Sequence, residues 1–135
     1  MIQRIQSIYL FLAALTAAGL FITPVKEQIF LDPTAWISVL FIVALILASA
    51  TPVVAIFLFQ NRSVQMQVVR TGLFFSIVLL GFAVGVLLSM GGFGRFMLDE
   101  ILSTGLPVLS VLLQALALRA IRRDEDLVKS IDRIR

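Results

Sequence analysis

The chain has 135 residues, of which 60% are hydrophobic and only 14% are charged, and its formal net charge is +3. An average soluble domain is about a quarter charged, and a soluble fold of this size cannot hide so much apolar surface. Lipid is therefore the expected solvent for most of the chain. Nucleic-acid binding is not expected, because the net charge is small and no stripe of arginine and aromatic residues is present.

The chain contains no cysteine and no histidine. Thiol nucleophiles, imidazole bases, the usual zinc sites and histidine-ligated haem are therefore excluded. Scattered carboxylates, serines and one tyrosine are the remaining reactive groups. We expect a protein that is not an enzyme and that holds no cofactor or metal ion.

Four long uncharged stretches divide the chain, with 21, 29, 24 and 18 residues between successive charged positions. A helix needs about 20 mostly apolar residues to cross the hydrocarbon core of a bilayer. The four predicted spans lie near 5–23, 34–59, 71–90 and 101–118. Helices are expected because each span must satisfy its own backbone hydrogen bonds in lipid. The sequence predicts an all-α integral membrane four-helix bundle with short loops and a charged cytoplasmic C-terminal helix.

The first span resembles a signal peptide, because Arg4 precedes an apolar run. That run is longer than the usual signal peptide, which has about 7 to 15 apolar residues, and no clear cleavage site follows it. The nearest small-residue candidate, at 16–18, lies inside the apolar stretch. A retained membrane anchor is the favoured interpretation.

Local signals mark the later spans. Asp32 and Pro33 are typical of a helix start, with the aspartate as the cap and the proline in the first helical position. Pro52 and Pro107 lie within the second and fourth spans, where each removes a backbone donor and is expected to bend its helix.

The lysine and arginine residues predict the orientation of the spans. Nine of the 11 lie on one side of the predicted membrane, whereas only Lys26 and Arg95 lie on the other. This asymmetry predicts that both termini and the 60–70 loop are cytoplasmic. The aromatic residues agree with it, since Tyr9 falls near the inner interface and Trp36 near the outer one, together with Phe93 and Phe96.

The segment 119–135 is a charged helical tail. Because 108–135 contains no glycine or proline, the fourth span could continue into the cytoplasm, or the acidic run 124–126 could open a new helix. Leu127, Ile131 and Ile134 recur on one helical face, and Glu125 can pair with Lys129. The tail is either an anchor that rests on the membrane or a docking helix for a partner. The candidate partner- or lipid-contacting residues are Arg62, Arg70, Arg119, Arg122, Arg123, Leu127, Ile131 and Ile134.

The third span contains Gly81 and Gly85, a G-x-x-x-G pair that Ser89 extends at the same spacing. Small residues let helix backbones approach closely in lipid. We expect the pair to pack within the chain's own bundle, with a dimer or partner interface as the alternative.

The fourth span carries Ser103, Ser110 and Gln114, and the last two share a face. One interhelical hydrogen bond would satisfy Gln114, which is the favoured interpretation, although a solute path would also need such groups. None of the spans contains an ionisable residue of the kind that coupled transporters use. Small four-span multidrug exporters are similar in hydropathy, but the glutamate of their first helix has no counterpart in 5–23.

Three stretches, MIQRIQSIYL, FLFQNRSVQMQVVR and RAIRRDEDLVKSIDRIR, resemble a Bacteroidota membrane-protein family, domain of unknown function 4293. The resemblance covers nearly the full length, in the order start, middle and end. The matching positions are Gln3, Arg4, Asn61, Arg62, Arg70, Arg119, Asp124, Glu125, Asp132 and Arg133. The resemblance implies a small four-helix protein of the bacterial inner membrane and supplies no activity.

The expected role is therefore non-catalytic. We expect an accessory, assembly or scaffolding subunit that presents its basic face to a membrane-protein partner or to anionic lipid headgroups. The alternative is a small channel or a carrier of lipid or solute that uses the Ser110–Gln114 face.

Overall fold

The structure is a computed structural model that describes residues 2–31, 33–89, 91 and 97–133. All regular secondary structure in these residues is helical. The elements in order are α1 (Ile2–Gly19), the short 3-10 helix η1 (Leu20–Ile22), α2 (Pro24–Leu31), α3 (Ala35–Phe57), α4 (Arg62–Ser89) and α5 (Met97–Asp132).

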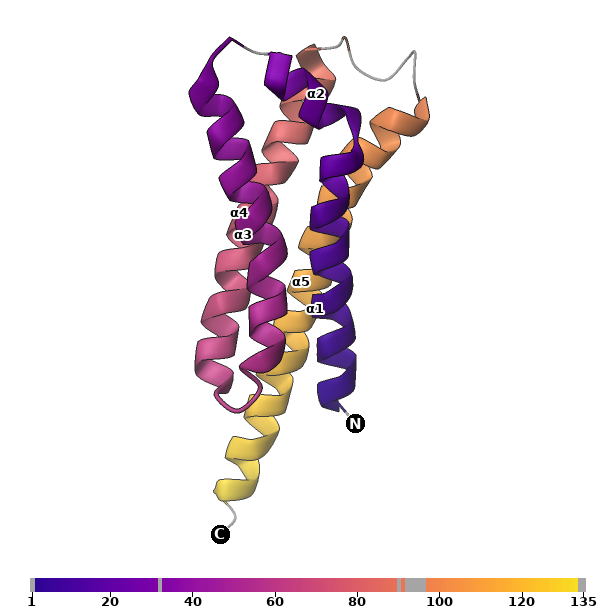
Figure 1. Cartoon of the computed structure of the whole chain (residues 1–135). Coiled ribbons are helices and arrows are strands. Elements are labelled where there is room, and N and C mark those ends of the chain that lie inside the picture. The colour runs from indigo at the N-terminus through magenta and orange to yellow at the C-terminus, as the bar shows by residue number, and fades with distance from the viewer. Residues whose placement is uncertain (1, 32, 90, 92–96, 134–135) are drawn as a thin grey trace.

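Four long helices lie side by side, and both termini are at the same end of the bundle (Figure 1). We call this the terminal end, and the short helix α2 lies at the opposite end. Packing runs in a closed ring, in which α3 contacts α4, α4 contacts α5, α5 contacts α1, and α1 contacts α3. Four segments are long and apolar enough to cross a membrane: Ile5–Ile22, Ala35–Phe57, Arg62–Ser89 and Ile101–Ile131. The predicted all-α fold with four spanning helices is confirmed.

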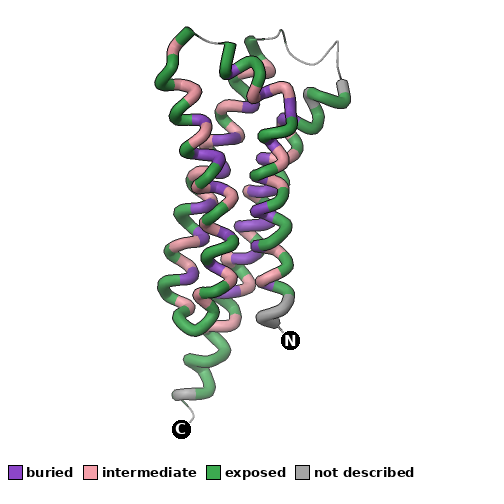
Figure 2. The backbone as a smooth tube through the Cα atoms, viewed as in Figure 1, coloured by how far each residue is buried: buried purple, intermediate pink, exposed green. Residues whose placement is uncertain are grey.

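Buried and exposed positions alternate along the four long helices (Figure 2). Small residues form much of the interior, and large apolar residues cover much of the outside. Ala13, Ala17, Ala44, Ala48 and Ala117 are all fully buried. Alanine at these positions lets helix axes approach closely. Close packing of this kind holds helices together in lipid, where the hydrophobic effect does not favour contact between helices. Many leucine, isoleucine and phenylalanine side chains face outward, which suits a hydrocarbon solvent and would be unusual on a soluble domain.

One helix boundary differs from the sequence prediction, and the structure decides a second that the sequence left open. The third spanning helix begins at Arg62 and not near residue 71, because an uncharged stretch marks the hydrocarbon-compatible part of a helix and not its ends. Helix α5 continues without a break to Asp132, so the tail extends the fourth span and does not open a second helix.

The predicted helix start at Asp32 and Pro33 is wrong. Helix α3 begins at Ala35, with Thr34 in the cap position and Pro33 in a bend, whereas Asp32 lies outside the described residues. The proline at the first helical position is instead Pro24, which opens α2.

Helix α2 itself was not predicted, because its eight residues include two charges and fall between spans. It buries Val25 and Ile29 against the bundle, and the Ser38 hydroxyl of α3 donates a hydrogen bond to the Ile29 carbonyl at 3.2 Å. The connection between α1 and α3 is therefore a packed element of the fold.

Candidate functional site

A cluster of polar side chains occupies the middle of the bundle. Ser76 of α4 and Ser110 and Gln114 of α5 are each 0% exposed. The Gln114 Nε2 atom donates to Ser76 Oγ at 2.8 Å and lies 3.3 Å from Ser110 Oγ. The Ser110 hydroxyl donates to the Ala13 carbonyl of α1 at 3.1 Å. These bonds join α5, α4 and α1 through their side chains.

The hydrogen bonds of this cluster have one consistent direction. The two hydroxyl oxygens of Ser76 and Ser110 are 3.2 Å apart, and either could donate. Because the Ser110 proton is directed at Ala13, the Ser76 proton is the one available for the Ser76–Ser110 bond. The amide thus donates to one hydroxyl, that hydroxyl to the next, and the last to a backbone carbonyl.

Helix α3, the remaining long helix, meets the cluster beside Gly72 of α4. A methyl group at Gly72 would overlap the Thr51 hydroxyl of α3 and would lie 2.9 Å from Gln114 Oε1. The Thr51 hydroxyl donates to Leu47 in its own helix at 2.6 Å. Gly72 is therefore the small residue that allows α3, α4 and α5 to meet.

The cluster is closed to solvent and fills the centre of the bundle. Gln114 Oε1 is a buried acceptor with no hydrogen bond in the described part of the chain. The three polar residues of the cluster are held by interhelical bonds. The Ser110–Gln114 face therefore lies inside the protein and does not line an open path. The arrangement can fix helix positions and does not suit passage of a solute.

The predicted close packing of Gly81 and Gly85 within the bundle is wrong. Both are exposed, and an added methyl group at either would meet nothing within 4 Å. The buried residues of this part of α4 are Leu79 and Ala83, which are each two residues away from Gly81 and therefore lie on the other side of the helix. The alternative, an interface with another chain, is the one that this geometry leaves open.

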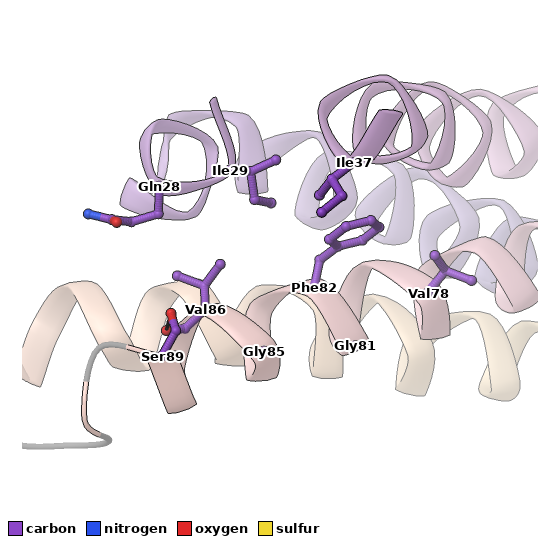
Figure 3. Close-up of a pocket in the computed structure, with 9 residues that line it drawn as sticks. All are labelled: Gln28, Ile29, Ile37, Val78, Gly81, Phe82, Gly85, Val86 and Ser89. Carbon is purple, nitrogen blue, oxygen red and sulfur yellow. Dashed lines mark hydrogen bonds between the residues drawn. The ribbon is translucent and has the colours of Figure 1, made fainter. Parts of the chain in front are cut away.

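Gly81 and Gly85 instead line an open groove of about 460 Å³ beneath α2 (Figure 3). Figure 3 shows Phe82 of α4 directed at Ile37 of α3, and Val86 directed toward α2. Gln28 and Ser89 are the polar residues of the lining. The groove is mostly apolar and lies at the end of the bundle opposite the termini.

An ion pair fixes the point where α5 leaves the bundle. The Arg62 guanidinium, in the first turn of α4, lies 3.0 Å from the Asp124 carboxylate and also donates to the Asp124 carbonyl at 3.2 Å. Arg62 was predicted to contact a partner or lipid, and the structure directs it into the chain itself. Nothing in the sequence signals this pair, because the two residues are far apart along the chain.

Beyond this pair, α5 projects past the other helices with every residue from 126 to 131 exposed (Figures 1 and 2). Leu127 is 47% exposed, Val128 is 42% and Ile131 is 62%. We call these three residues the tail ridge; Ile134, predicted to continue it, lies outside the described residues. The predicted pair forms, with Lys129 Nζ 2.7 Å from Glu125 Oε1.

The other predicted contact residues remain on the surface. The arginines Arg70, Arg119, Arg122 and Arg123 are all exposed. No group of three or more acidic side chains in the described ranges is placed to hold a metal ion.

A second groove, also missed by the sequence analysis, opens at the terminal end between the start of α1 and the end of α3. It measures about 670 Å³, and its lining includes Gln6, Ile8, Phe57, Phe59 and Gln65. We call it the Gln6 groove. Two glutamines among apolar residues were the only available signal, and nothing in the sequence places them together.

No curated protein matches the chain, and no solved structure matches it. The model of the family described as a domain of unknown function (DUF4293) matches residues 2–134, which is nearly the whole chain. The four candidate membrane helices together make this a multi-pass membrane protein by length and composition. The chain therefore belongs to the DUF4293 family.

Proposed function

We propose that the protein is a non-catalytic accessory or assembly subunit of a larger membrane complex, and that α5 docks on the partner through its projecting tail. The observation that carries this proposal is the exposed tail ridge on a helix that extends past the bundle. Short isolated helices are marginal in water, and most helical stability in proteins comes from packing an apolar face. A projecting helix with an uncovered apolar ridge is therefore suited to a second surface.

A protein surface fits the tail better than a bilayer surface. The exposed Asp126 directly precedes the ridge, and an anionic leaflet would repel its carboxylate. The Arg62–Asp124 pair also sets the direction of α5 as it leaves the bundle. A helix held in a defined direction loses less entropy on docking than a free tail would.

The location that we propose is the bacterial inner membrane, with both termini in the cytoplasm. Both termini lie at one end of the bundle, and nine of the 11 lysine and arginine residues belong to that side in the predicted topology. The positive-inside rule supports a cytoplasmic assignment for it. The exposed arginines there would also attract anionic headgroups, so lipids are proposed partners as well.

A channel or carrier is less well supported. That role was expected to use Ser110 and Gln114, and both are fully buried in bonds that join helices. A solid polar centre supports a structural role for these residues.

The test is co-purification from native membranes in mild detergent, read by mass spectrometry. The variant Leu127→Ser with Ile131→Ser should lose a stoichiometric partner while membrane insertion and abundance stay normal. Each apolar side chain contributes about 1.5–3 kcal/mol when fully buried, so the double change should weaken binding by well over tenfold. The control, Arg133→Gln with Arg135→Gln, should reduce binding to anionic liposomes more than it reduces partner binding.

The opposite pattern would contradict the proposal. If the serine variant keeps its partners and loses only liposome binding, the tail is a membrane-surface anchor. If wild-type protein brings down no stoichiometric partner, the accessory role itself fails.

A further inference from the structure

The Gln6 groove contains a hydrogen-bond donor that nothing in the described part of the chain satisfies. Gln6 is only 5% exposed, and its Nε2 atom is buried without a hydrogen-bond partner there. An unpaired amide in an apolar setting is costly, so buried amides are normally bonded. Because Gln6 also lines the groove, a molecule bound there could supply the missing acceptor.

The second glutamine of the groove shows that the local fold can satisfy such an amide. Gln65 is 3% exposed, and its Nε2 atom donates to the Ala55 carbonyl at 3.0 Å. That carbonyl also accepts from the Leu58 amide at the end of α3. Gln65 thus completes the protein's own backbone bonding, whereas the Gln6 donor remains for a ligand.

The groove wall indicates a hydrocarbon ligand. Ile8, Phe57 and Phe59 are all more than half exposed along it, and Phe57 is 76% exposed. None of the described lining residues is a lysine or arginine, so the groove does not suit a free phosphate ion. Its volume of about 670 Å³ falls within the range of small-molecule sites.

The depth of the groove indicates which polar group the ligand offers. The first apolar span begins at Ile5 and the second ends at Phe57, so the proposed topology places Gln6 and Phe57 near the boundary of the hydrocarbon layer. Phospholipids place their ester carbonyls at that boundary, between the headgroups and the acyl chains. A carbonyl oxygen is an acceptor that an amide N–H can use.

We propose that the Gln6 groove binds one glycerophospholipid molecule. The Gln6 Nε2 atom donates to an ester carbonyl of the lipid, and the acyl chain lies along Ile8, Phe57 and Phe59. This site is distinct from the exposed arginines, which attract headgroups by charge alone. It also does not depend on the tail ridge, which lies on α5.

The test compares two phospholipids with the same headgroup and chain length, one diester and one diether, because the diether lacks the carbonyl. Purified full-length protein in detergent is titrated with each lipid, and occupancy is read by native mass spectrometry. One net hydrogen bond corresponds to about a 3- to 10-fold preference for the diester. Gln6→Met should reduce that preference to about 1, since methionine keeps the length of the side chain and removes the donor.

Two further variants separate the donor from general effects. Gln67→Met makes the same change at an exposed position of α4 outside the groove and should keep the wild-type preference. Phe57→Ser should weaken both lipids to a similar degree, and because Phe57 is mostly exposed the fold should tolerate it. Equal binding of the two lipids by wild type, an unchanged preference in Gln6→Met, or unchanged binding in Phe57→Ser would each overturn the proposal.

Discussion

Arg62 and Asp124 meet at 3.0 Å where α5 leaves the bundle, so the first turn of α4 is joined to the C-terminal helix at this point. Two nitrogens of the guanidinium are used, one for the carboxylate and one for the Asp124 carbonyl. This fork geometry belongs to arginine, and a lysine at the same position could offer only a point charge.

The first prediction concerns this pair. Arg62→Lys should loosen the tail, because the second hydrogen bond to the carbonyl is lost. A double-mutant cycle with Arg62→Gln and Asp124→Asn should give a coupling energy of about 0.5–1 kcal/mol, as for a partly exposed pair. Thermal unfolding in detergent measures the coupling, and hydrogen exchange of residues 119–132 measures the loosening. A coupling energy of zero would mean that the pair does not hold α5.

The second prediction concerns the central polar cluster. Ser76→Ala removes the acceptor of Gln114 and leaves that amide with only the longer contact to Ser110. We expect a loss of about 1 kcal/mol in the free energy of unfolding, since interhelical hydrogen bonds in membranes are worth about 0.6 kcal/mol on average and up to about 1.7.

Ser49→Ala is the matched control for that change, because the Ser49 hydroxyl bonds only to carbonyls of its own helix among the bonds described, at 2.8 and 3.1 Å. It should change stability by a few tenths of a kcal/mol at most. Equal effects of the two serine substitutions would show that the cluster does not join the helices energetically.

The third prediction separates the glycines of α4. Gly72→Ala should destabilise the protein by about 1–3 kcal/mol, the usual cost of overpacking, because the new methyl group meets Thr51 and Gln114. Gly81→Ala and Gly85→Ala should be neutral or stabilising by up to about 1 kcal/mol, because alanine favours a helix and nothing lies nearby. Melting in detergent distinguishes the two outcomes, and a large loss at Gly81 or Gly85 would place another chain against that face.

The fourth prediction concerns topology. Reporter fusions at Gln28, Ser63, Gly92 and Arg135 should report outside, inside, outside and inside, because the lysine and arginine residues are concentrated on one side. Cysteine accessibility at the same positions provides an independent measurement. An outside signal at Arg135 would reverse the proposed orientation and place the tail ridge away from cytoplasmic partners.

The sequence determined the number of spanning helices, their approximate positions and the solvent that they require. These features depend on local chemistry, since each span must satisfy its own backbone bonds and offer lipid an apolar surface over about 20 residues. The same local reasoning found the Glu125–Lys129 pair, whose members are one turn apart.

The sequence could not determine which face of each helix points inward. In a soluble helix a polar stripe marks the outside. These spans are apolar on all sides, because positions that face lipid and positions that face the protein core both favour apolar side chains. Gly72 and Gly81 therefore look alike in the sequence, although one meets Thr51 and the other meets nothing. Only the packing of the four helices decided that difference, and it alone brought Arg62 to Asp124 and left the Gln6 amide without a partner in the described chain.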